Sequence, residues 1–325
     1  MRAWHVHRNG EPGEVMRLEE AERPVPGAGQ VLLKVRAANV NFPDALLCRG
    51  QYQITPPLPF TPGLEICGET EDGRRVIANP ALPYGGFAEY AVADAAALLP
   101  APDALDDAEA AALHVGYQTG WFGLHRRAGL QAGETLLVHA AAGGVGSAAV
   151  QLGNAAGARV IGVVGGPEKA KVARELGCDL VLDRRADDVV AAVKEATGGR
   201  GADVVYDSVG GAAYAQSARC VAFEGRILVI GFASGTIPTP ALNHALVKNY
   251  SIVGLHWGLY AQKDPGSVAD CHERLTELAA KGAIRPLVSE RLPLTGAADA
   301  VRRVADGVTT GRVVVEPGRA DGAAA

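Results

Sequence analysis

The pattern of apolar and polar positions changes part-way along the chain. From about residue 133 to residue 255, short apolar runs alternate with amphipathic stretches. The runs predict strands at 135–140, 159–165, 179–183, 202–207, 226–231 and 250–255, and the stretches predict helices at 145–156, 168–176, 187–197, 212–222 and 242–248. This alternation is typical of βαβ units in a parallel sheet covered by helices on both faces. We therefore predict an α/β fold with a six-stranded doubly wound sheet, made of two mononucleotide-binding halves.

The residues on either side of this sheet indicate a second, mostly β domain. Residues 1 to about 110 are rich in proline and glycine, with β-like runs at 30–35, 75–78 and 88–92. After residue 256, predicted elements at 267–281, 287–292, 297–305 and 312–316 form a tail too short to be a domain of its own. We expect it to complete the first domain, which gives boundaries at 1–115, 116–256 and 257–325. Residues 318–325 are expected to lack fixed structure.

A glycine-rich turn joins the first strand of the sheet to the helix that follows. Ala140 stands loosely at the first glycine position of the usual G-x-G-x-x-G spacing, Gly143 permits a tight turn, and Gly146 permits close packing of helix on strand. The backbone N–H groups of such a turn favour a pyrophosphate. A strand before it, a helix after it and a six-strand alternation are the context that a dinucleotide site requires. The alternative is a strand-to-helix turn without a ligand. The residues expected at the pyrophosphate are Ala142, Gly143, Gly144, Val145 and Gly146.

The end of the second strand indicates which nicotinamide cofactor binds. NAD-binding proteins usually carry an acid there for the ribose 2′-hydroxyl. Residues 164–167 are Val-Gly-Gly-Pro, and Lys169 follows. An ammonium near an open strand tip suits a 2′-phosphate, and Arg184 and Arg185 after the third strand add charge on the same edge. Glu168 favours the other cofactor, NAD, because its carboxylate could bond the ribose 2′-hydroxyl. The alternative for Lys169 is a solvated helix residue with no cofactor contact. NADPH is the predicted cofactor.

Composition narrows the function classes. The chain has 325 residues, a formal net charge of -5 and 48% hydrophobic residues, so it offers no basic surface for nucleic acid. No apolar run reaches the ~18–20 residues that span a bilayer, and the first ten residues lack the apolar stretch of a signal peptide. The five cysteines form no C-x-x-C pair, which favours reduced thiols and a cytoplasmic location without membrane contact.

Several segments, taken in order, carry a family resemblance. They are NVNFPDALLCRGQY (39–52), PLPFTPGLEICGE (57–69), GGFAEYAV (85–92), VGYQTGWFGL (115–124), AAAGGVGSAAVQLG (140–153) and GFASG (231–235). Together they resemble the medium-chain dehydrogenase/reductase superfamily over nearly the whole chain, and its quinone oxidoreductase branch in particular. The resemblance implies a Rossmann domain, a GroES-like catalytic domain and NADPH-dependent oxidoreductase activity.

The chain departs from the zinc-dependent members of this family at two ligand positions. Asn41 stands where they carry a catalytic cysteine, and Leu64 precedes Glu65 where they carry a histidine. A structural zinc would need four closely spaced cysteines, which the sequence lacks. Separately from the family, the eight histidines show no ligand spacing with cysteine or carboxylate, and zinc needs three or four such ligands. We therefore expect no metal.

The resemblance also implies roles for individual residues. Thr119 would bond the nicotinamide carboxamide, and Tyr52 and Asn41 would lie on the substrate side as neutral donors to a carbonyl. Asp44 is expected to pin the substrate-side loop through turn or capping bonds. Tyr52 is alternatively a plain loop tyrosine, Phe232 and Trp257 core residues, and His256 a structural histidine. The remaining cofactor candidates are Gly165, Lys169, Arg184, Phe232, Ser234, His256 and Trp257.

These features favour one reaction over others. Without a Lewis acid, the charge that develops in hydride transfer is best carried by a quinone or a conjugated carbonyl compound, which spreads it to a distant oxygen. The alternatives are an enoyl-thioester reductase and a non-catalytic NADPH-binding sensor or structural protein. The apolar sixth strand predicts a homodimer through the sheet edge. The sequence does not specify the natural substrate, the pathway or the proton donor.

Overall fold

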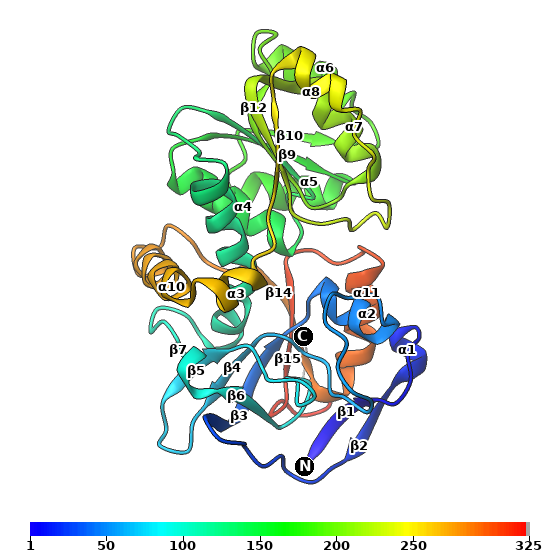
Figure 1. Cartoon of the computed structure of the whole chain (residues 1–325), viewed down its shortest axis with the longest axis vertical. Helices are drawn as coiled ribbons and strands as arrows, with labels where there is room; N and C mark the ends of the chain where they lie inside the picture. Colours follow the sequence, from blue (N-terminus) through cyan, green and yellow to red (C-terminus); the bar gives the residue numbers. More distant parts are fainter. Residues whose placement is uncertain (323–325) are drawn as a thin grey trace. The chain divides into compact units, whose positions relative to one another are not determined.

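The structure, a computed structural model, describes residues 1–322 and separates the chain into two compact units. Unit 1 contains both ends of the chain, up to Val115 and from Arg285 onward. Unit 2 contains Gly116–Ile284. Helix α3 (Asp107–Trp121) crosses the first boundary (Figure 1).

Unit 2 ends later than the sequence pattern indicated. We expected the return segment to begin at residue 257, and the structure places the boundary at 284. The reason is a set of contacts within unit 2. The side-chain amide of Gln118 donates to the carbonyl of Val268 at 3.3 Å, and Arg126 forms an ion pair with Asp264 at 2.9 Å. The helices after residue 257 therefore belong to the sheet-containing unit.

Unit 2 is built on one parallel sheet. Its strands are β8 (Thr135–His139), β9 (Arg159–Val164), β10 (Leu180–Asp183), β11 (Ala202–Asp207), β12 (Val221–Val229) and β13 (Ser251–Gly254). They lie in the order β10-β9-β8-β11-β12-β13, and every pairing is parallel. This order confirms the predicted doubly wound sheet, in which the strand sequence reverses direction beside the first strand.

Helices connect these strands. They are η2, a π-helix (Phe122–Arg127), α4 (Gly144–Ala155), α5 (Pro167–Glu175), α6 (Val189–Ala196), α7 (Gly211–Cys220), α8 (Leu242–Lys248), α9 (Gly258–Lys263) and α10 (Pro265–Ala280). One boundary differs from the expected pattern, because α7 ends at Cys220 and β12 begins directly at Val221. Val221 and Ala222 are buried, and Val221 pairs with Ala202 of β11. Burial in the sheet therefore competes successfully with helix propensity at these two positions.

Unit 1 is mostly β. Its elements are β1 (Arg2–Val6), α1 (Pro12–Val15), β2 (Met16–Glu20), β3 (Gln30–Asn39), α2 (Phe42–Arg49), β4 (Ile66–Glu69), β5 (Arg75–Ala78), β6 (Tyr90–Asp94), η1 (Ala95–Ala97), β7 (Leu99–Pro100), β14 (Val288–Pro293), η3 (Leu294–Gly296), α11 (Ala297–Ala305) and β15 (Arg312–Glu316). A sheet in the order β14-β15-β3-β4-β5-β7, with β6 also on β3, forms its centre. Strands β1 and β2 form a separate antiparallel pair.

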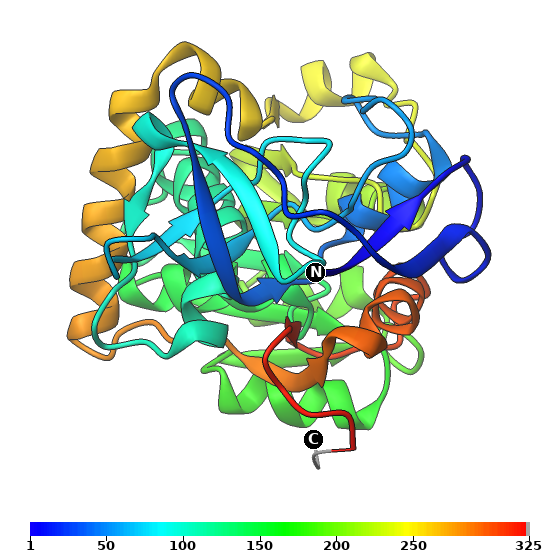
Figure 2. The same cartoon turned by 90° about the horizontal axis from the view of Figure 1, so that it is seen from below.

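The two ends of the chain build unit 1 together (Figure 2). Strand β15 pairs antiparallel with β3, with Val314 opposite Asn39. The indole nitrogen of Trp4 donates to the buried carbonyl of Leu294 at 2.7 Å. The tail therefore returns to the first domain, as predicted, and it is held there by contacts between residues more than 270 positions apart in sequence.

Two further findings concern the chain as described. Within residues 1–322, no helix is both long enough and apolar enough to cross a membrane. The expected lack of structure at the end is wrong up to residue 322, because Asp321 accepts a hydrogen bond from Thr295 at 2.6 Å. The rest of that prediction, residues 323–325, lies outside the described residues.

Candidate functional site

The predicted cofactor residues of unit 2 gather at one edge of the sheet. All six strands are parallel, so their carboxyl ends share that edge. The glycine turn follows β8, and Gly165 follows β9. Strand β8 pairs with both β9 and β11, which makes it the point where the strand order reverses. Ligands of open α/β sheets bind in the crevice outside the strand ends at this point.

The turn after β8 requires glycine at one position in particular. Ala140 adopts a left-handed φ of 51°, and its carbonyl accepts a hydrogen bond from Gly143 N at 2.8 Å. A Cβ on Gly146 would lie 2.8 Å from the carbonyl carbon of Ala140 and closer still to the oxygen. The first turn of helix α4 therefore packs directly against the end of β8. Gly143, at the N-cap, has no side chain to cap the helix, so the first backbone N–H groups of α4 suit an anion.

Three cations surround the tip of β9. A Cβ on Gly165 would lie 3.0 Å from Nε of Arg184, and one on Gly166 would lie 3.1 Å from Nη1 of Arg185. Burial lowers the pKa of Lys169, and the charges of Arg184 and Arg185 lower it further. The structure thus brings together the three basic residues that the sequence placed on this edge.

An acid also lies at this tip, but its carboxylate faces the backbone. Asp183, the last residue of β10, accepts hydrogen bonds from Gly166 N and Arg185 N, each at 3.0 Å. These backbone hydrogen bonds hold the pKa of Asp183 below its usual range. Its charge fixes the loop that carries the arginines, which sequence reasoning did not foresee.

The loop after β12 is fastened to the turn after β11. Ala233 N donates to the carbonyl of Ser208 at 3.1 Å, and Ser234 N donates to the carbonyl of Val209 at 3.0 Å. A Cβ on Gly210 would lie 2.9 Å from the ring of Phe232. Phe232 is half-buried and Ser234 is exposed, so both stand at the sheet edge rather than in the core.

The segment after β13 is held by helix α3. The indole N–H of Trp257 donates to Oε1 of Gln118 at 3.0 Å, and Gln118 is fully buried. Thr119, the next residue of α3, is also buried. His256 is exposed, and its ring lies against Gly258. Gln118, which sequence reasoning missed, thus links the Trp257 segment to the helix that carries Thr119.

In unit 1, Asn41 belongs to a buried polar network. Its side-chain N–H groups donate to Oε2 of Glu65 at 2.9 Å and to the carbonyl of Asn39 at 3.4 Å. Its Oδ1 accepts from Nη1 of Arg312 at 3.0 Å and from Asn39 at 3.2 Å. The amide of Asn41 is therefore committed to the framework of the unit. The guanidinium contact also makes this donor set a poor fit for Zn²⁺, which prefers thiolate, imidazole and carboxylate ligands.

Glu65 is the centre of that network. It is fully buried and accepts hydrogen bonds from Asn39 at 2.8 Å and from the backbone N of Val115 at 2.7 Å. Burial raises the pKa of Glu65, against the opposing charge of Arg312. Nε and Nη2 of Arg312 have no hydrogen-bond partner within residues 1–322. Sequence reasoning missed Arg312, because an arginine ahead of three valines gives no sign of its distant partners.

Tyr52 lies in the loop after α2, half-buried against the apolar core of unit 1. Burial raises its pKa, with a smaller contribution from Asp44, so the phenol keeps its proton near neutral pH. Asp44 accepts from Asn41 N at 2.8 Å and from Gly63 N at 2.9 Å. This confirms its predicted role in pinning the loop. Burial raises the pKa of Asp44 to about 7.

One prediction about the histidines is wrong. The sequence shows no ligand spacing of the histidines with cysteine or carboxylate, yet the structure brings His5, His7 and Glu19 together in unit 1. The i, i+2 spacing of His5 and His7 was a usable signal, because alternate residues of a strand share a face. Glu19 comes from the partner strand, which the sequence alone did not pair with it.

Two protein-family models match the chain. Residues 27–103 match the alcohol dehydrogenase GroES-like domain, and residues 144–274 match the zinc-binding dehydrogenase domain. Among curated proteins, the quinone oxidoreductase-like protein 2 homolog of Nematostella vectensis is 38% identical over 300 residues, 89% of this chain and 82% of that protein.

Solved structures agree with these matches. The Escherichia coli quinone oxidoreductase complexed with NADPH superimposes with a TM-score of 0.90 at 28% identity, covering 98% of this chain and 100% of that one. The quinone oxidoreductase of Thermus thermophilus, described with its NADPH complex, gives a TM-score of 0.85 at 33% identity, covering 97% and 100%.

The close approach at Gly146 generates a prediction. Gly146→Ala would press a methyl group into the carbonyl of Ala140, so we expect a loss of about 2–3 kcal/mol of unfolding free energy and loss of dinucleotide binding. Urea unfolding and fluorescence titration with NADPH measure the two effects. Gly266→Ala is the matched control in the first turn of α10, where no atom lies within 4 Å, and it should raise stability slightly. Normal NADPH binding by Gly146→Ala would contradict the assignment of this turn.

Proposed function

Because this chain belongs to the medium-chain dehydrogenase/reductase family, with quinone oxidoreductase-like proteins among its relatives, we propose that it reduces quinones or conjugated carbonyl compounds with NADPH and without a metal. The observation that carries the proposal is the cluster of Lys169, Arg184 and Arg185 at the strand tip beside a glycine turn. It supports a phosphorylated dinucleotide as the cofactor.

The residues of unit 2 fit NADPH. The N-terminal N–H groups of α4 would receive the pyrophosphate, and the basic cluster at β9 would receive the 2′-phosphate. The solved quinone oxidoreductases of E. coli and T. thermophilus form complexes with NADPH. Thr119, Phe232, Ser234, His256 and Trp257 are proposed to hold the nicotinamide end. NADPH, when bound, supplies the hydride.

The substrate side favours chemistry without zinc. Asn41 and Leu64 stand at the two positions where zinc-dependent relatives carry ligands, and Arg312 occupies the oxygen of Asn41. With its amide committed to Glu65, Asn41 acts as a framework residue in this proposal. Tyr52, half-buried and protonated, is then the proposed donor to the substrate oxygen.

The acceptor follows from this donor set. A simple ketone would place a full negative charge on one oxygen, and a single neutral phenol stabilises that charge poorly. A quinone or a conjugated carbonyl compound spreads the charge over several atoms, so hydrogen bonding and later proton uptake suffice. The described cysteines are all free, and four of the five are buried, which is consistent with the proposed cytoplasmic location.

The first prediction of this section concerns cofactor choice. Lys169→Ala should weaken NADPH binding about tenfold, equal to about 1.4 kcal/mol, and leave NADH binding nearly unchanged. The control is Lys171→Ala on the same helix, because the Lys171 side chain is exposed and lies near Glu175. Titration of cofactor fluorescence measures both affinities. Equal affinity of the unmutated protein for NADPH and NADH would remove the basis of the proposal.

The second prediction concerns the reaction. Oxidation of NADPH should proceed with quinones, enones or enals, should persist in a chelator, and should not reverse with simple alcohols and NADP⁺. Tyr52→Phe should lower turnover by less than the 10²–10⁴-fold expected for loss of an essential general acid. Tyr84→Phe, at an exposed loop tyrosine, is the control.

Other outcomes of the same screen separate the alternatives. Turnover of enoyl thioesters alone would identify an enoyl-thioester reductase, and NADPH binding without turnover would indicate a sensor or structural protein. Efficient oxidation of alcohols that stops in a chelator would overturn the proposed function.

The third prediction concerns assembly. Strand β13 ends the sheet order, and α8 just before it exposes Leu242, Leu246 and Val247, each more than two-thirds exposed. We propose that two copies pair through this edge and helix. Light scattering at micromolar concentration should give twice the 33.5 kDa chain mass. Leu246→Glu should yield monomer, whereas Val308→Glu in unit 1 should not; a monomeric unmutated protein would contradict the pairing.

A further inference from the structure

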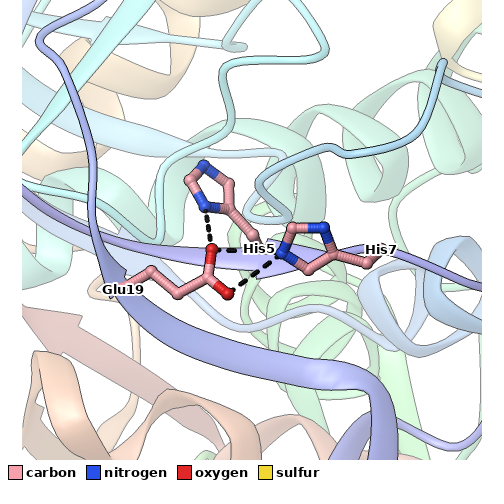
Figure 3. Close-up of side chains that lie close together, drawn as sticks. All are labelled: His5, His7 and Glu19. Carbon is pink, nitrogen blue, oxygen red and sulfur yellow. Dashed lines mark hydrogen bonds and ion pairs between the residues drawn. The ribbon is translucent and has the colours of Figure 1, made fainter.

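The two-stranded sheet of unit 1 carries a cluster of ligand-type side chains. Strands β1 and β2 are antiparallel, with Ala3 opposite Glu19 and His5 opposite Arg17. Opposite and alternate residues share a face, so Glu19 lies diagonally from His5 across the pair. Ala3 is small, which leaves the long Glu19 side chain free to lean toward the histidines. His7 follows directly after β1 and faces the same carboxylate (Figure 3).

The ring nitrogens of both histidines converge on that carboxylate. Nδ1 of His5 lies 2.9 Å from Oε2 of Glu19, and Nε2 of His7 lies 3.0 Å from Oε1 and 3.1 Å from Oε2 (Figure 3). The two ring centroids are 5.9 Å apart, at an angle of 74°. One ligand atom from each residue lies within 4.8 Å of the other two. The three side chains therefore frame a single point.

We propose that His5, His7 and Glu19 bind a divalent first-row transition-metal ion of the Zn²⁺ type at the surface of unit 1. Two imidazoles and a carboxylate are the donors that zinc favours, whereas Ca²⁺ and Mg²⁺ prefer oxygen ligands alone. Metal–ligand bonds of about 2.0–2.2 Å in a tetrahedron place neighbouring donors about 3.3 Å apart. The two nitrogen–carboxylate separations, 2.9 and 3.0 Å, need to widen by only a few tenths of an ångström, and the two ring nitrogens, within 4.8 Å of each other, must reach the same spacing.

Exposure and charge set the expected strength of the site. The His7 side chain is 52% exposed and that of Glu19 is 38% exposed, so water has access to a fourth position. Arg17 lies on the same face, and its positive charge opposes the binding of a cation. Its Nη1 donates a hydrogen bond to the carbonyl of Met16. We expect a dissociation constant on the order of 1 μM rather than the tighter binding of closed structural zinc sites.

The bound ion would add a cross-link between two strands that form a two-stranded sheet of their own. Glu19 comes from β2 and the histidines from β1, so the metal closes a bridge across the pair. A ligand that binds the folded state alone raises its stability. The site uses none of the residues proposed for cofactor or substrate, so its role is to stabilise the N-terminal strands.

Calorimetric titration of untagged, chelator-treated protein with Zn²⁺ tests the proposal. We expect one ion per chain and at least tenfold weaker binding by Glu19→Gln, which keeps the shape of the side chain. Glu20→Gln is the matched control, because Glu20 is the exposed neighbour on the opposite face of β2 and lies near the N-terminal amine. His7→Gln, at an exposed position, is the second variant and should also lose the site.

A spectroscopic readout fixes the identity of the ligands. With one equivalent of Cu²⁺ as the probe, the electron paramagnetic resonance spectrum should show hyperfine coupling to two imidazole nitrogens, and to one in His7→Gln. NADPH oxidation should be the same with and without added zinc, so this test is independent of the proposed function. Equal zinc binding by the unmutated protein and Glu19→Gln, or no uptake at about 100-fold the expected dissociation constant, would overturn the proposal.

Discussion

The contact between Gly146 and the carbonyl of Ala140 governs the dinucleotide half of this protein. No side chain fits between them, so helix α4 begins directly over the end of β8. Ala140 takes a left-handed φ to make the turn, a conformation that costs a non-glycine residue roughly 1–2 kcal/mol. Because β8 is also the strand where the sheet order reverses, this one approach places the helix N-terminus at the crevice that the other strand ends share.

The charged residues at the tip of β9 divide into one acid that holds the backbone and three basic residues. At the β9 tip, the carboxylate of Asp183 is used by Gly166 N and Arg185 N. Its negative charge therefore stabilises the loop, and the side chains of Arg184 and Arg185 stay over the glycines. Burial lowers the pKa of Lys169, and repulsion by the two guanidiniums lowers it further. A phosphate at this tip would relieve that repulsion.

The sheet and its turn could be predicted because their signals are local. Apolar runs, a glycine turn and the strand-tip residues 164–167 are each contiguous in sequence, and parallel strands bring their ends to one edge. The boundary at residue 284, the contact of Arg312 with Asn41 and the meeting of Glu19 with His5 depend on pairings between distant segments. Hydrophobic periodicity carries no information about such distant partners. In the sequence, the polar residues that form these contacts look like ordinary surface residues.

The buried network of unit 1 affects the proposed chemistry because it uses hydrogen-bonding groups that could otherwise face a substrate. Glu65 takes up the donors of Asn39 and Asn41, and the guanidinium of Arg312 takes up the oxygen of Asn41. The amide of Asn41 is therefore committed to this network and is not a free donor to a substrate oxygen. Tyr52, with its raised pKa, is a donor that holds its proton rather than one that transfers it readily. In the proposed function, the acceptor itself then carries the charge that develops during reduction, which is the property that distinguishes quinones and conjugated carbonyl compounds from simple ketones.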